Sequence, residues 1–146
     1  MNKYIHLSEK NTSVMIKHST EERVKGEIAD YFFDSTDGIL YSYSKKTKRT
    51  VHLIQENIKL VQSIVGEKPV PLLIYLCNSP VPDKAARTYS TQNLSKVYSA
   101  MAMVSKPGLS QYIMNILFRF SRPPIPMRSF VDDQKARAWL QSLTHE

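Results

Sequence analysis

The sequence contains few of the residues that usually build metal and nucleotide sites. Its 146 residues include one cysteine, four histidines and four glycines. A single cysteine excludes an internal disulfide, and together with four scattered histidines it does not supply the ligands of a standard zinc site. No two glycines lie near each other, which excludes a Walker phosphate loop and a dinucleotide-binding fingerprint. We therefore predict no metal and no cofactor.

Long hydrophobic runs are also missing. The longest uncharged stretch, residues 69–82, is shorter than the roughly 20 apolar residues of a membrane-spanning helix. The polar start of the chain lacks the apolar core of a signal peptide. These absences predict a cytoplasmic protein, and peripheral association with a membrane stays open. With 42% hydrophobic and 23% charged residues, the composition is that of a globular protein, and the length fits one domain.

Acidic residues are absent from residues 84–131, where seven basic residues account for the whole net charge of +7. A surface of one sign attracts anionic partners. Lys106, Arg119, Arg122 and Arg128 are candidate contacts for a small anionic ligand or an acidic lipid surface, and salt should weaken such binding. Alternatively, the seven side chains point to different sides and serve solubility. Nucleic acid is less favoured because no recognised binding motif accompanies the charge.

Turn and periodicity signals predict the order of the elements. Residues 1–27 are polar and are interpreted as an extension with one short strand at most, at 13–17, before a single domain over residues 28–146. The Asp37-Gly38 pair between two β-rich segments is typical of an antiparallel hairpin. Helices are expected at 51–65, 84–96, 109–120 and 134–143, with further strands at 70–77, 98–104 and 126–131. Thr50 and Asp83 are the candidate N-caps of the first two helices.

The run at residues 70–77 is almost unbroken in its apolar character and is bounded by prolines. Such a run is typical of a strand buried on both faces of a parallel sheet. Strands that alternate with helices of this length imply crossover connections and a sheet covered by helices. The sequence therefore predicts an α/β sandwich, with an N-terminal antiparallel hairpin followed by alternating helices and strands in a mainly parallel sheet.

Several short phrases support a more specific interpretation. They are Asp37-Gly38-Ile39, Pro71-Leu72-Leu73-Ile74, Lys84-Ala85-Ala86-Arg87, Ala100-Met101-Ala102-Met103-Val104, Pro123-Pro124-Ile125-Pro126, Phe130-Val131-Asp132-Asp133 and Ala138-Trp139-Leu140. In this order and spacing, over residues 28–143, the chain resembles the SpoIIAA-like, STAS-like fold, and in particular small uncharacterised bacterial proteins of Bacteroidetes type. The resemblance implies that fold and a habit of association between proteins, without an assigned chemistry.

Relatives that regulate sigma factors carry a phosphorylatable serine where a helix begins after a central strand. The corresponding turn here, residues 77–83, lacks the Asp-Ser-Gly type of signature. Its nearest hydroxyl, Ser79, is flanked by Asn78 and Pro80 and lies several residues before the helix. We interpret Ser79 as a turn residue.

No catalytic residue is predicted. Cys77 ends an apolar strand, where a cysteine usually acts as a small inert hydrophobic residue. The pair Asp132-Asp133 opens a helix, where negative side chains interact well with the helix dipole. An enzyme stays the third class of function, because residues that meet only in space are not visible in the sequence.

The helix expected over residues 109–120 carries more apolar surface than one contact with a sheet requires. Met114 and Phe118 lie beside its main apolar stripe and widen the apolar arc, and basic residues stand at its ends. We therefore predict a non-enzymatic binding or regulatory protein that acts through self-association or a protein partner. The candidate interface residues are Tyr112, Met114, Phe118 and Arg119. Two alternatives stay open: the helix is simply buried between the sheet and a neighbouring element, or it lies on a lipid surface. The main apolar stripe of this helix consists of Leu109, Tyr112, Ile113, Ile116, Leu117 and Phe120.

Overall fold

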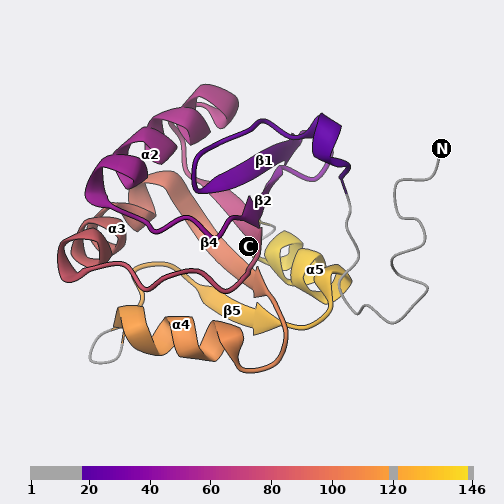
Figure 1. Ribbon diagram of the computed structural model, residues 1–146. Helices are drawn as coiled ribbons and strands as arrows, with labels where there is room; N and C mark the ends of the chain where they lie inside the picture. The colour runs from indigo at the N-terminus through magenta and orange to yellow at the C-terminus, as the bar shows by residue number, and fades with distance from the viewer. Residues whose placement is uncertain (1–17, 119–121, 145–146) are drawn as a thin grey trace.

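A five-stranded sheet organises the chain in the computed structural model, which describes residues 18–118 and 122–144 (Figure 1). The described α-helices and strands agree with the expected ones to within two residues at each end, whereas the short η1 was not predicted. The described elements are η1 (Thr20–Glu22), β1 (Ala29–Asp34), β2 (Ile39–Ser44), α2 (Val51–Val65), β3 (Val70–Tyr75), α3 (Lys84–Val97), β4 (Tyr98–Val104), α4 (Leu109–Phe118), β5 (Met127–Phe130) and α5 (Asp133–Thr144).

The strands follow one another in the sheet in the order of the chain. β1 pairs with β2 in antiparallel fashion, and β2, β3, β4 and β5 are parallel neighbours. The turn of the hairpin has the chemistry expected of Asp37-Gly38. Asp37 Oδ1 accepts a hydrogen bond from Ile39 N at 2.9 Å, and Gly38 has a φ of 73°, which a residue with a side chain rarely adopts. The predicted fold class is confirmed.

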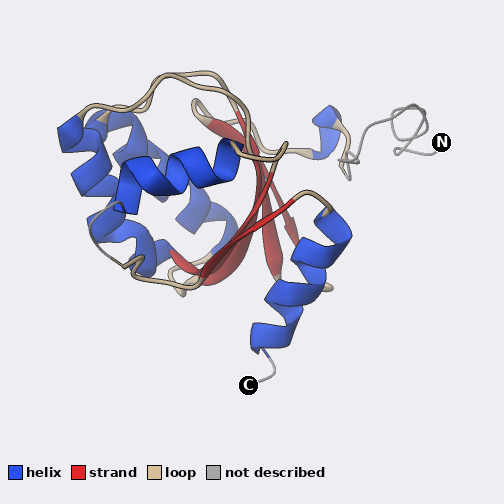
Figure 2. Ribbon diagram, turned by 90° about the horizontal axis from the view of Figure 1, so that it is seen from below, coloured by secondary structure: helices blue, strands red, loops and turns tan. Residues whose placement is uncertain are grey.

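Three helices cover one face of the sheet and one helix covers the other (Figure 2). Crossovers between parallel strands are almost always right-handed, and here each crossover adds the next strand on the same side. α2, α3 and α4 therefore lie on one face, which we call the three-helix face. α5 follows the last strand and packs on the opposite face, which we call the α5 face.

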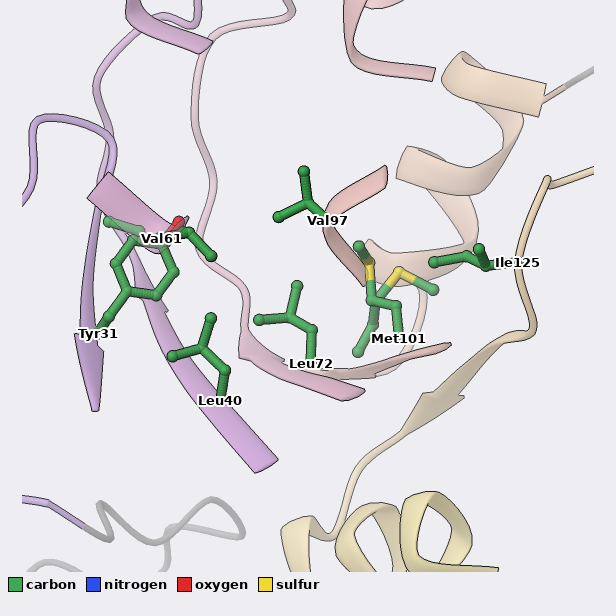
Figure 3. Packing of buried hydrophobic residues seen from close by; sticks show 9 residues of the cluster. Tyr31, Leu40, Val61, Leu72, Val97, Met101 and Ile125 are labelled. Carbon is green, nitrogen blue, oxygen red and sulfur yellow. The ribbon is translucent and has the colours of Figure 1, made fainter. Parts of the chain in front are cut away.

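The core consists of two clusters of buried side chains, one on each face of the sheet, and β3 contributes to both. Leu72 belongs to the cluster on the three-helix face, and Leu73 belongs to the cluster on the α5 face. Both side chains are at most 2% exposed, which confirms that this strand is buried on both faces. Figure 3 shows the first cluster, with Leu40, Leu72 and Met101 of the sheet below Val61 of α2. Burial of each such side chain stabilises the fold by about 1.5–3 kcal/mol.

Polar residues define where the two longest helices begin. Thr50 Oγ1 accepts a hydrogen bond from Leu53 N at 3.1 Å at the start of α2. Asp83 Oδ1 accepts one from Ala86 N at 2.9 Å at the start of α3. Each side chain satisfies a backbone donor that has no partner inside the helix. Both caps agree with the sequence analysis.

Residues just before the hairpin pack on the sheet. His18 is 4% exposed, and its ring stacks on that of Phe32, with ring centroids 3.9 Å apart. His18 Nδ1 and the Tyr43 hydroxyl are hydrogen-bonded at 2.8 Å. Val24 pairs with Tyr31 in an isolated bridge. The polar segment predicted as an extension is thus attached to the domain from residue 18 onward, and the short strand expected at 13–17 lies outside the described residues.

No helix within residues 18–118 and 122–144 combines the length and the apolar character that crossing a bilayer demands.

Candidate functional site

A groove of about 240 Å³ lies between the three-helix face of the sheet and the helices above it. We call it the sheet–helix groove. Leu72, Met101 and Met103 of the sheet line it from one side, and Leu94 of α3 and Ile113 of α4 line it from the other. Most of its other lining side chains are also apolar. The groove is therefore suited to hold a molecule with a hydrocarbon surface.

The sequence of α3 explains why this space is not filled. Ala86, Ser90, Leu94 and Val97 recur at helical spacing and all line the groove. The side chains of Ala86 and Ser90 are small, so the first half of α3 does not fill the space above the sheet. Protein interiors are otherwise packed as densely as organic crystals, which makes a hollow of this size notable.

One end of the groove is polar. It is lined by Ser44 at the end of β2, Cys77 after β3 and Arg49 before α2. Cys77 Sγ donates a hydrogen bond to the Ser44 carbonyl at 3.3 Å. The Oγ of Ser44 is buried and has no hydrogen-bond partner within the described part of the chain.

The Arg49 side chain is half-buried at this polar end. Its Nη1 donates to the carbonyls of Lys45 at 2.7 Å and Thr47 at 2.8 Å, and its Nη2 donates to the carbonyl of Ile28 at 3.0 Å. Burial lowers the pKa of the guanidinium from its ordinary value. No carboxylate of the described residues lies within ion-pair distance of it.

Buried phenols form another part of the wall. The Tyr31 hydroxyl donates to Asn57 Oδ1 at 2.9 Å. Burial raises the pKa of Tyr31 and of Tyr98, so both phenols are neutral in the folded protein. The charged residues among those that line the groove in the described structure are Arg49 and Arg87, and neither a carboxylate nor a histidine joins them. The lining is therefore apolar with an excess of positive charge.

α4 directs the row that contains Met114 and Phe118 toward the protein. Phe118 is 8% exposed, and Met114 packs against the core cluster of the three-helix face. Ser110, which is buried, lies on the same side of the helix, because residues four apart share a face. Met114 and Phe118, which widen the apolar arc of α4, are thus directed toward the rest of the chain. Their role in an interface stays a prediction.

The main apolar stripe of α4 faces the groove instead. Leu109, Ile113, Ile116 and Leu117 line it and are half-buried. Tyr112 lines the groove and is 56% exposed, so it lies at the rim. Arg119, the remaining candidate interface residue, lies outside the described residues, as does Phe120.

The described candidates for anion binding do not come together. Lys106 precedes α4 and Arg122 follows it, and a helix of ten residues separates its ends by about 15 Å. Arg128 lies over the ring of Phe130, 5.3 Å from its centroid, on the α5 face. These three residues therefore do not surround one small anion.

Other candidates have structural surroundings. Ser79 is half-buried in the irregular segment between β3 and α3 and lines the groove. Asp133 is buried and accepts a hydrogen bond from the Tyr75 hydroxyl at 2.8 Å. No cluster of three or more potential metal-ligating side chains occurs in the described ranges.

Sequence analysis missed Ser44 and Arg49 as site residues. Arg49 belongs to a short basic run, residues 45–49, whose other members gave no sign that one side chain turns inward. The one available signal was its position directly before the N-cap Thr50. This position places Arg49 in the connection that leaves the carboxyl end of β2, which is the edge of the sheet where the polar end of the groove lies.

The comparisons with known proteins identify the fold and the family. The structure is similar to that of an uncharacterized protein from the DUF3478 family, with a SpoIIAA-like fold, from Shewanella loihica PV-4. The two chains are 18% identical, the TM-score is 0.56, and the match covers 84% of this chain and 98% of the other. At that identity the similarity shows the fold alone, and it confirms the resemblance found in the sequence. No curated protein matches the chain. A domain of unknown function, DUF7793, matches residues 33–144, and the protein belongs to this family.

Proposed function

We propose that this protein is a non-enzymatic binding protein that holds a small, largely apolar molecule in the sheet–helix groove. The SpoIIAA-like fold suggests a binding or regulatory role, in agreement with the function expected from the sequence. The proposal assigns that role to the groove.

The observation that carries the proposal is the apolar lining of the groove together with its size. A protein cavity of about 150 Å³ lined by Leu, Ile and Phe binds benzene, and this groove is larger, at about 240 Å³. Transfer of apolar ligand surface from water into it contributes about 25 cal/mol per Å².

The polar groups of the groove support binding over catalysis. Arg49 and Arg87 are both bonded to backbone carbonyls, Arg87 to that of Pro82 at 2.7 Å. The described lining offers no carboxylate or histidine to transfer a proton. Cys77 has the Ser44 carbonyl as its hydrogen-bond acceptor and no neighbouring base in the lining.

A fluorescent apolar molecule tests the proposal. N-phenyl-1-naphthylamine is neutral and brightens in apolar surroundings, and we expect it to bind saturably with one molecule per chain. Ser90→Phe fills the groove under α3 and should abolish the signal. Ser95→Phe introduces the same ring on the exposed side of α3 and should leave the signal unchanged. Circular dichroism and a cooperative thermal transition show whether each variant is folded.

Two results would contradict the proposal. One is a folded wild-type protein that does not bind the dye. The other is binding by folded Ser90→Phe that equals binding by Ser95→Phe.

Self-association is a second candidate function, and the exposure of the groove rim favours it. Tyr112 is 56% exposed and Val81 is 43% exposed, although both are large apolar side chains. A second copy that covers this rim would bury both, and aromatic residues are common anchors in such interfaces. Sedimentation velocity should then show dimers at high micromolar concentration, lost in Tyr112→Glu and kept in Gln111→Glu. A wild-type monomer over this range argues against self-association.

A further inference from the structure

The polar end of the sheet–helix groove is built by three segments that are distant in the sequence. Ser44 ends β2, Arg49 stands two residues before α2, and Cys77 follows β3. The hydrogen bond from Cys77 Sγ to the Ser44 carbonyl joins two of these segments at 3.3 Å. Arg49 is held at the same place, because its Nη1 donates at 2.7 Å to the carbonyl of Lys45, the residue that follows Ser44. The three side chains therefore form one local environment.

Arg49 retains hydrogen-bonding capacity and uncompensated charge. Its bonds to the three backbone carbonyls leave the Nε–H and one Nη2–H unused within the described structure. Its neighbourhood contains no carboxylate at ion-pair distance among the described residues. Removal of a guanidinium from water disfavours its charge unless an anion is nearby. The site thus offers a cation and two N–H donors to whatever enters the groove.

The hydroxyl of Ser44 is a second indication that a ligand group binds here. Its Oγ is buried and unpartnered among the described residues. Folded proteins pair the large majority of buried polar side-chain atoms, so an unpaired hydroxyl calls for an explanation. Rotation of the Ser44 side chain about χ1 would let the hydroxyl pair with an acceptor on a ligand in the groove.

We propose that the groove binds an amphiphile whose carboxylate contacts Arg49 and Ser44 and whose hydrocarbon chain lies over the apolar floor of the groove. This inference rests on the proposed function and adds the chemical class of the ligand. A guanidinium presents adjacent N–H groups that match the two oxygens of a carboxylate. The single charge of a carboxylate suits one available guanidinium better than the double charge of a phosphate monoester. The absence of carboxylates from the described lining removes electrostatic repulsion.

Three ligands of equal chain length test the inference. Decanoate, 1-decanol and decyl phosphate compete with bound N-phenyl-1-naphthylamine at pH 8, where the carboxylate is ionised. For the wild-type protein we expect decanoate to bind about tenfold more tightly than 1-decanol, because one charge-assisted hydrogen-bonded pair adds about this factor to the affinity. Decyl phosphate should bind more weakly than decanoate.

Variants identify the residues that bind the head group. Arg49→Met should weaken the binding of decanoate about tenfold and leave the affinity for 1-decanol within about twofold, because the ligand contact that is lost is the one to the charge. Ser44→Ala should weaken decanoate about threefold without loss of thermal stability, since no protein group pairs with the hydroxyl. Lys48→Met removes the same charge from an exposed position and should change the affinity for neither ligand.

The outcomes separate this inference from the proposed function. Equal affinity of the wild-type protein for decanoate and 1-decanol overturns the assignment of the head group, although the groove still binds apolar ligands. Tighter binding of decyl phosphate overturns the choice of a carboxylate. If the dye binds but none of the three ligands displaces it, this inference fails and the proposed function stands; if the dye itself does not bind, both proposals fail. If Arg49→Met does not fold, Ser44→Ala is the deciding variant. A ratio of decanoate to 1-decanol affinity that is the same in Ser44→Ala as in the wild-type protein counts against the inference.

Discussion

Leu73 illustrates what one side chain contributes to this fold. It lies in the middle of β3, is fully buried on the α5 face and belongs to the same cluster as Tyr41 and Leu140. Its neighbour Leu72 has the same side chain but lines the sheet–helix groove. Adjacent residues of one strand thus serve the core on one face and the candidate site on the other, because side chains alternate along a strand.

Shortening of Leu73 should destabilise the whole protein. Leu73→Ala removes buried methyl groups and leaves a cavity, so we expect the free energy of unfolding to fall by about 3 kcal/mol. Val131 is 44% exposed, and Val131→Ala should cost less than about 0.5 kcal/mol. Urea denaturation followed by circular dichroism measures both values. Similar losses in the two variants would contradict the burial of Leu73.

The thiol of Cys77 can report on the groove, because it is the single cysteine of the chain and lines the polar end. At a decanoate concentration about ten times the dissociation constant, about one chain in ten is free. Alkylation by N-ethylmaleimide, followed by mass spectrometry, should then be about tenfold slower. Folded Ser90→Phe, which is expected to bind no ligand, serves as the control and should show no protection by decanoate. Equal rates with and without decanoate in the wild-type protein would show that a bound ligand does not cover Cys77.

At the scale of elements, α4 is the helix whose orientation matters most. Its sequence has apolar residues over a wide arc, and the periodicity alone favours the stripe from Leu109 to Leu117 as the buried side. In the structure this stripe lines the groove, Met114 packs against the core cluster of the three-helix face, and Phe118 is buried and also lines the groove. A helix that divides its apolar surface in this way can border a ligand site without losing its attachment to the sheet.

Two substitutions in α4 test this division. Phe118→Ala should lower the free energy of unfolding by about 3 kcal/mol, because a buried aromatic ring is lost. Tyr112→Ala should lower it by less than about 0.5 kcal/mol, since the ring is mostly exposed. Chemical denaturation of the two variants under identical conditions gives the comparison. A larger loss in Tyr112→Ala than in Phe118→Ala would mean that the helix is turned the other way.

At the scale of the whole molecule, the sheet buries several tyrosines, and two of their hydroxyls donate to carboxylates, Tyr41 to Asp37 at 2.7 Å and Tyr75 to Asp133 at 2.8 Å. Desolvation raises the pKa of Tyr41, Tyr43 and Tyr75 above the ordinary value of 10.0. The carboxylates of Asp37 beside Tyr41 and of Asp133 beside Tyr75 raise the pKa of these two phenols further. The folded protein therefore keeps phenolic protons that the unfolded chain releases in alkaline solution.

Stability should consequently decrease at high pH. Below the ordinary tyrosine value of 10.0, both states are protonated and the phenols do not affect the pH dependence. Above it the unfolded state binds fewer protons, so the free energy of unfolding falls as pH rises toward the higher folded values. Urea midpoints should be constant from about pH 8 to 9.5 and then decline. Absorbance at 295 nm should show these tyrosines ionising together with unfolding. Ionisation of all of them in a fully folded protein at pH 11 would contradict their burial.

Local chemistry along the chain was sufficient to predict the fold. The Asp37-Gly38 turn, the N-caps Thr50 and Asp83 and the apolar run at 70–77 each express a preference that acts over a few residues. Their order, with the rule for right-handed crossovers, leads to the layered α/β sandwich. The acid-free stretch from residue 84 was equally visible, and it accounts for part of the acid-free lining of the groove.

The candidate site was not predictable in the same way, because it depends on how the elements are rotated and spaced. The rotation of α4 about its axis, the inward turn of Arg49 and the space below Ala86 and Ser90 all arise from contacts between distant segments. The same holds for the separation of Lys106, Arg122 and Arg128, which are near in the sequence but lie at different ends and faces of the sheet. Turns and caps follow from neighbouring residues, whereas a groove exists only where packing between whole elements leaves one.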